Sequence, residues 1–151
     1  MPTFLDQRTS QGARAGTVST APAADYIGGI GLIVNSATNI RTDLEATVGI
    51  LQPISLTGSS LTLFIERTTV ANLTTPGAGT EVFRQTFGIP PVTIATPFTF
   101  SLSAADIAPA ATDPDAPGQL TYALFATTDA DGIFAPTYNG LQNFNGSAAA
   151  D

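Results

Sequence analysis

Two glutamates, Glu66 and Glu81, are the residues of this chain whose type and placement could support catalysis. They flank a loop predicted at residues 68–79, so they would approach each other if the strands on either side pair. A glycosidase places two carboxylates in a cleft and usually adds aromatic platforms for sugar. The chain has no Trp and three Tyr, and Arg67 and Arg84 lie beside the two glutamates. We therefore interpret both carboxylates as surface residues near arginines and predict that the protein is not an enzyme.

Residue types that the sequence lacks exclude most other site chemistry. The chain contains no His, no Cys and no Lys. Without His there is no Ser–His or Cys–His nucleophile pair and no imidazole ligand for a metal. Without Cys there is no disulfide or thiolate site, and without Lys no Schiff base. We expect no cofactor, and stability that comes from packing and hydrogen bonding alone.

The sequence Asp129-Ala-Asp131-Gly132 resembles the middle of a calcium-binding loop. A complete loop of that type needs a ligand two residues before Asp129 and a Glu at its end, but Thr127 and Tyr138 occupy those places. Asp and Gly are also the residues expected in a turn. We therefore predict a turn at these residues, and Asp129 and Asp131 are weak candidates for a calcium site.

The charge of the chain argues against two classes of partner. Twelve acidic residues against five arginines give a formal net charge of −7, with no basic stripe to neutralise phosphates. Nucleic acid and anionic membrane surfaces are therefore not expected as partners. The N-terminus has no basic region followed by an apolar one, so no classical signal peptide is predicted. The longest apolar run, residues 27–34, is too short to span a bilayer.

Residues 39–50 show the clearest structural pattern. Apolar side chains alternate with charged or polar ones, which predicts a strand with one buried and one exposed face. Similar patterns recur at intervals typical of a β-sandwich. We predict eight strands near residues 26–34, 39–50, 61–67, 80–87, 97–103, 119–127, 133–138 and 141–148. The expected core residues are Ile40, Leu44, Val48, Phe98, Phe100, Leu120, Tyr122 and Leu124.

The connections between these strands set the predicted fold class. Residues 35–38 and Asn139-Gly140 are expected to form hairpin turns, and residues 104–118 a long loop that contains three prolines. Eight strands with long crossing loops favour an all-β fold, a single jelly-roll β-sandwich of antiparallel strands. An immunoglobulin-like Greek key is the alternative, although its Cys and Trp marks are missing.

Residues 1–22 differ from the rest because they show little periodicity. We predict that they form an extended N-terminal arm, with the sandwich domain at residues 23–151. A disordered tail is the alternative interpretation. Phe4 and Leu5 would anchor the arm on a neighbouring subunit. Phe64 and Phe125 fall on the other parity from their apolar neighbours, so we predict that they cap a rim or face a subunit contact.

Several runs of the sequence resemble a known family of surface proteins. The runs lie at residues 30–50, 60–70, 96–104, 118–128 and 141–150. They are similar to spore-surface domains of endospore-forming bacteria, both exosporium-type domains with a tumour-necrosis-factor-like jelly roll and endospore appendage fibre subunits. The resemblance implies self-assembling subunits that reach the outside without a signal peptide. Appendage connectors of this kind generally carry cysteines, and this chain has none.

We therefore expect a structural subunit of an extracellular or spore-surface filament. Its partners would be copies of itself, linked when the N-terminal arm of one subunit docks on the next. A closed homotrimeric tip or binding module is the first alternative, and a capsid-type decoration protein is the second.

Overall fold

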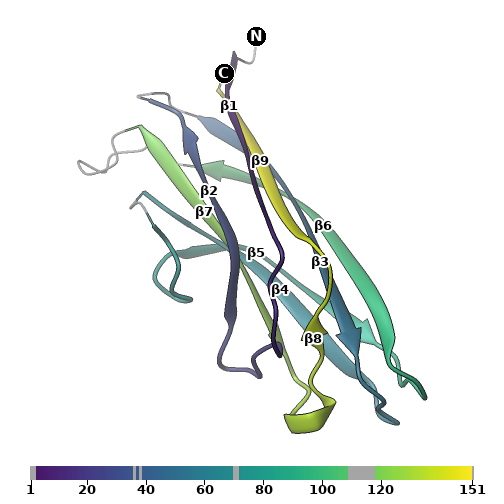
Figure 1. Ribbon diagram of the computed structural model, residues 1–151. Coiled ribbons are helices and arrows are strands. Elements are labelled where there is room, and N and C mark those ends of the chain that lie inside the picture. Colours follow the sequence, from purple (N-terminus) through teal and green to yellow (C-terminus); the bar gives the residue numbers. More distant parts are fainter. Residues whose placement is uncertain (1–2, 36, 38, 70–71, 109–117, 151) are drawn as a thin grey trace.

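Two antiparallel sheets pack face to face in the computed structural model of the chain, which describes residues 3–35, 37, 39–69, 72–108 and 118–150 (Figure 1). Sheet A has the strand order β1-β9-β3-β6, with β8 also paired to β3, and sheet B has the order β2-β7-β4-β5. The elements are β1 (Thr3–Gly12), β2 (Asp25–Ile33), β3 (Ile40–Gln52), β4 (Ser59–Thr68), β5 (Thr80–Ile89), β6 (Thr96–Ala108), β7 (Gln119–Thr128), the 3-10 turn η1 (Gly132–Phe134), β8 (Thr137–Tyr138) and β9 (Gln142–Ala150).

The path of the chain between the sheets is that of a jelly roll. Strands β4 and β5 form a hairpin in sheet B, whereas the connections β1–β2, β2–β3, β3–β4, β5–β6, β6–β7 and β7–β8 cross to the other sheet. Strands β8 and β9 both pair with β3, so they act as one interrupted strand. The two sheets therefore have four strand positions each, which confirms the predicted jelly-roll sandwich.

Strand β3 lies in the middle of sheet A, and the core forms on its inner face. It pairs with β6 without a register shift from Ile40↔Ala108 to Gln52↔Thr96. Six predicted core residues are buried between the sheets, at 0–1% exposure: Ile40, Leu44, Val48, Leu120, Tyr122 and Leu124. Phe98 and Phe100 pack against this core but stay half-buried, because β6 is the edge strand of sheet A.

The predicted connections need four corrections. Asn139-Gly140 is not a hairpin turn, because β8 and β9 pair with β3 and not with each other. The connection after β2 crosses between sheets, so it is not a hairpin either. Residues 104–108 continue β6 and are not loop, while residues 109–117 lie outside the described part. The strand expected at 133–138 is divided between η1 and β8.

The N-terminal segment is a regular strand of the sandwich. Residues Thr3 to Gly12 form β1, which pairs with β9 of the same chain along its length. In Figure 1 β1 follows β9 from the two chain ends at the top toward the lower end. Within one copy these residues complete sheet A, and the domain boundary at residue 22 stays a prediction. Docking of the segment on a neighbouring subunit stays a prediction.

No helix in the described part of the chain has the length and apolar character that crossing a bilayer requires.

Candidate functional site

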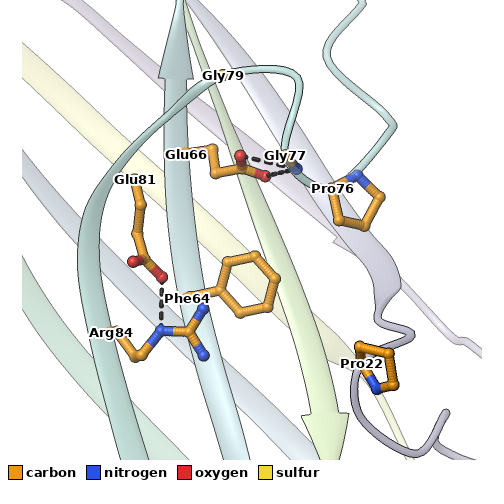
Figure 2. A pocket seen from close by; sticks show the side chains of 8 residues that line it. All are labelled: Pro22, Phe64, Glu66, Pro76, Gly77, Gly79, Glu81 and Arg84. Atoms are coloured by element: carbon orange, nitrogen blue, oxygen red, sulfur yellow. Dashed lines mark hydrogen bonds and ion pairs between the residues drawn. The ribbon is translucent and has the colours of Figure 1, made fainter.

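A hollow of about 430 Å³ on the outer face of sheet B brings the two predicted glutamates together (Figure 2). Glu66 and Glu81 are opposite each other where β4 pairs with β5, just after a register shift. Glu66 is 3% exposed, and both of its carboxylate oxygens accept the N–H of Gly77, at 2.9 and 3.0 Å. The other lining residues are Pro22, Phe64, Pro76, Gly79 and Arg84.

The partners of these carboxylates favour a structural role. Glu81 Oε1 accepts a 2.6 Å hydrogen bond from Arg84 Nε, and the Arg84 guanidinium lies 4.5 Å from the centre of the Phe64 ring. The aromatic face that could stack on a sugar is therefore already covered by the arginine. Glu66 fixes the turn at Gly77, since a buried carboxylate needs such donors. The pairing of Glu66 with Glu81 is as anticipated, while the absence of enzymatic activity stays a prediction.

A buried polar cluster around Asp25 joins the two sheets near the β1–β2 connection. Tyr138 of sheet A donates a 2.6 Å hydrogen bond to Asp25 of sheet B. Ser19 donates from its N–H and its hydroxyl, and Arg14 completes the set with a 3.2 Å ion pair. Burial alone would raise the pKa of Asp25, but the bonds from Tyr138 and Ser19 hold it below its ordinary value. Burial raises the pKa of Tyr138, and the bond to Asp25 adds to that rise.

A second cluster joins the sheets at Asp106 of β6. Asp106 Oδ2 accepts from Arg67 at 2.6 Å and from the Tyr122 hydroxyl at 2.9 Å, and both of these residues belong to sheet B. The hydroxyl oxygen of Thr42, on β3, lies 2.9 Å from the Tyr122 hydroxyl. Burial is the main cause that raises the pKa of Tyr122. In a chain without Cys, these two clusters supply specific polar cross-links between the sheets.

The calcium candidates are part of a turn. Asp129 Oδ1 accepts the N–H of Ser60 at 2.6 Å, which ties the end of β7 to the start of β4. Asp131 is exposed and precedes η1. No group of three or more acidic side chains able to hold a metal ion occurs within the described ranges. The geometry of Asp129 fits the turn interpretation.

Phe64 and Phe125 lie on the outer face of sheet B, as their parity indicates, but this chain covers them. Phe125 is fully buried and Phe64 is 6% exposed. Their rings stack with centroids 5.3 Å apart, and Leu73 from the loop before β5 completes the cluster. The prediction of a subunit contact at this pair is corrected accordingly, because the loop occupies the place that a neighbour would take.

Phe4 and Leu5 lie on opposite faces of sheet A. Successive side chains of β1 alternate between the faces, so Leu5 turns toward the core while Phe4 remains 65% exposed. The register with β9 shifts between Phe4 and Asp6. Asp6 accepts the N–H of Ile33 on β2 at 2.8 Å, which links β1 to the other sheet. Most other side chains of β1 are exposed. Leu5 thus anchors β1 on its own domain, and Phe4 is the residue that a neighbour could cover.

Sequence reasoning missed both inter-sheet clusters. Asp25 precedes an apolar run, and Asp106 lies among alanines just before Pro109, so neither looked like part of a buried network. The available signal was parity: Asp106 shares its face with Ala104 and Ala108, which predicts an inward carboxylate that needs partners.

Comparisons with known proteins support the fold. No protein-family model matches the sequence, and no curated protein matches it. A chain from the structure of infectious bursal disease virus, Gx strain, matches 97% of this chain with a TM-score of 0.50 and 9% identity. The present chain spans about a third of the length of that virus chain. At this identity the match shows a shared jelly-roll architecture.

Two other solved structures match with lower scores. A chain of the Bacillus endospore appendages, described as disulfide-linked pili, covers all of this chain and 92% of its own length, with a TM-score of 0.34 and 12% identity. An enzymatically active domain of tailspike protein 4 from bacteriophage CBA120 covers 94% of this chain and 18% of its own, with a TM-score of 0.28 and 11% identity. The fold comparison therefore rests on the virus chain.

Proposed function

We propose that the protein is a structural subunit that assembles with copies of itself, and that β1 links neighbouring copies by pairing with β9 of the next. The observation that carries this proposal is the position of β1. It is one of the two edge strands of sheet A, the other being β6, most of its side chains are exposed, and Leu5 is its main apolar anchor. An edge strand with little buried apolar surface can leave its own sheet at low cost.

Exchange of β1 between copies would preserve its contacts. The same backbone ladder and the Asp6–Ile33 bond would form with a second copy, so the change in free energy is confined to the hinge and to association. Residues 13–16 are the hinge, because Thr17 bridges to Thr137 of the main body. Within the hinge Arg14 bonds to Gln142, Tyr26 and Asp25, and Gly16 accepts the N–H of Tyr138, so the exchange must release these contacts in one copy. Four residues reach about 14 Å, which requires the neighbour to lie side by side.

The remaining surface supports a structural role. The outer face of sheet A presents Thr, Ser, Asn and Gln beside a few charges, and the sequence has no Lys. Glu66 binds the N–H of Gly77 and Glu81 binds Arg84 within the sheet B hollow, which supports the proposal of a structural role for both. With the resemblance to spore-surface domains, we place the assembly in an extracellular or spore-surface filament. A closed trimer and a decoration protein are the competing arrangements.

Electron microscopy of the purified chain tests this function. We expect filaments from the full chain, and fewer or thinner ones when a synthetic peptide of residues 1–12 is added in excess, because the peptide would occupy the β9 edge. A peptide of the same composition in scrambled order is the control and should have no effect. Compact particles at every protein concentration would contradict the proposal, and uniform trimers would favour the closed alternative.

A further inference from the structure

One end of the sandwich carries a group of exposed large apolar side chains. They belong to the β3–β4, β5–β6 and β7–β9 connections, which lie together at the lower end in Figure 1, opposite the two chain ends. We name this surface the loop end. Its apolar residues are Ile54, Leu56, Ile94, Ile133 and Phe134.

Hydrogen bonds hold the connections of the loop end side by side. Ser55 and Val92 exchange two backbone bonds, of 3.0 and 2.8 Å, which hold the β3–β4 and β5–β6 connections together. Gln52 donates its side-chain amide to the Phe134 carbonyl at 2.9 Å and to the Pro53 carbonyl at 3.2 Å. The third connection is therefore fixed beside the first.

The area of the loop end is that of an interface. Its five apolar residues are 48–83% exposed. They expose on the order of 600 Å² of side chain, taking ~170 Å² for one fully exposed large apolar residue. The largest apolar patch on a monomer is typically about 300–600 Å², and a stable interface buries about 800 Å² on each partner. The loop end thus has nearly the area that a stable contact needs.

The charge of the loop end argues against anionic binding partners. Its three connections contain no Lys or Arg, and their acidic residues are Asp129 and Asp131. Anionic lipid and nucleic acid would be repelled by such a surface. A partner that is apolar and carries a positive charge would fit better.

The same chain presents such a surface near its opposite end. Phe4, Ala149, Arg41 and Ile107 are successive cross-strand partners on the outer face of sheet A, and we name them the terminal row. Phe4 is 65% exposed and Ile107 81%, and between them the Arg41 side chain is 70% exposed, with Asp43 3.5 Å away. The row combines apolar area with an arginine.

We infer that the loop end of one copy packs on the terminal row of the next. Apolar side chains would then meet apolar side chains, and the acidic residues Asp129 and Asp131 would lie near Arg41. A contact between two different surfaces of one chain is heterologous and continues as an open polymer unless it closes into a ring. This inference rests on the proposed function, namely self-assembly, and adds an end-to-end contact to the side-by-side exchange of β1.

The test must remove the β1 exchange, so that failure of one proposal is not mistaken for failure of the other. The variant Thr9→Cys/Asn145→Cys, oxidised at low concentration, locks β1 on its own β9, because the two residues are register partners. In this locked chain we make two further variants. One carries Leu56→Ser and Ile133→Ser at the loop end, and the other carries Phe4→Ser and Ile107→Ser in the terminal row.

Sedimentation velocity of these two variants, alone and mixed, then tests whether the loop end binds the terminal row of another copy. We expect neither variant to associate alone and a 1:1 mixture to form dimers, since each supplies the surface that the other lacks, with self-association of each at least about tenfold weaker than that of the locked parent. Gln85→Ser, an exposed change on β5, is the matched control and should associate like the parent.

Three results would overturn the inference. Dimers of the terminal-row variant alone would mean that the loop end pairs with itself. Binding of the locked parent to phosphatidylcholine vesicles that is lost with Leu56→Ser/Ile133→Ser would make the loop end a lipid-binding surface. A locked parent that stays monomeric at all concentrations would remove the end-to-end contact while leaving the β1 proposal standing.

Discussion

Phe4 and Leu5 lie on opposite faces of sheet A, because successive side chains of a strand alternate between its two faces. Leu5 packs against the core of its own domain, whereas Phe4 is 65% exposed. One residue can therefore hold β1 on a sandwich while the other remains available to another copy.

This separation predicts different effects for the two alanine variants. Leu5→Ala should lower the free energy of unfolding by about 1–2 kcal/mol, since a half-buried leucine is lost. Phe4→Ala should change it by less than about 0.5 kcal/mol and should instead weaken assembly. Urea unfolding at a protein concentration where the chain is monomeric measures the first effect, and sedimentation the second. Equal losses of stability would show that Phe4 is buried in the monomer.

Tyr122→Phe should destabilise the fold by about 1.5–3 kcal/mol, because Asp106 loses a hydrogen bond inside the sandwich. Tyr26→Phe is the matched control, since no hydrogen bond of its hydroxyl appears among the described residues, and it should cost much less. Urea midpoints of both variants provide the measurement. An unchanged urea midpoint for Tyr122→Phe would mean that the ion pair with Arg67 is enough to compensate the buried carboxylate of Asp106.

Acid should destabilise the protein through Asp25. Its pKa is below the ordinary 3.8 in the folded state, so the carboxylate contributes stability above that value and loses it as the pH falls through the lowered folded pKa. The free energy of unfolding should be nearly flat between about pH 5 and 7 and fall below about pH 4. The Asp25→Asn variant should be less stable at neutral pH, and its free energy of unfolding should fall less steeply as the pH is lowered. Identical slopes in both chains would remove Asp25 as the cause.

A chelator should leave the melting temperature unchanged within about 1 °C, because Asp129 is engaged with Ser60 in a turn. Scanning calorimetry with calcium and with excess EDTA tests this. A chelator-dependent fall that disappears in Asp131→Asn would instead establish a calcium site.

Alternation along the chain was enough to predict the strands that have one apolar face. In β3 the residues from Ile40 to Ile50 alternate in the structure as they do in the sequence. The same holds for β7 on its inner face, where Leu120, Tyr122 and Leu124 are buried. Local pattern decides such strands, because each has one face in the core and the sheet register keeps it there.

Strands without that alternation were not predictable from local pattern. Strand β1 is an edge with both faces largely exposed, so its place depends on the backbone ladder to β9, far away in sequence. Residues 104–108 at the end of β6 were predicted as loop because three prolines follow them, and the partners of Asp106, Arg67 and Tyr122, come from other strands. Phe64 showed the right parity, but the loop that covers it could not be placed from sequence.

The location of the cross-link in Thr9→Cys/Asn145→Cys tests the central claim most directly. The chain has no other cysteine, and the two residues lie opposite each other in the β1–β9 ladder. Oxidation after assembly should give a ladder of covalent oligomers on a non-reducing gel if β1 pairs with a neighbour. Glu45→Cys/Ser103→Cys, register partners on β3 and β6, should give only intramolecular bonds. Monomers alone from the β1–β9 pair, in samples that are visibly assembled, would contradict the account.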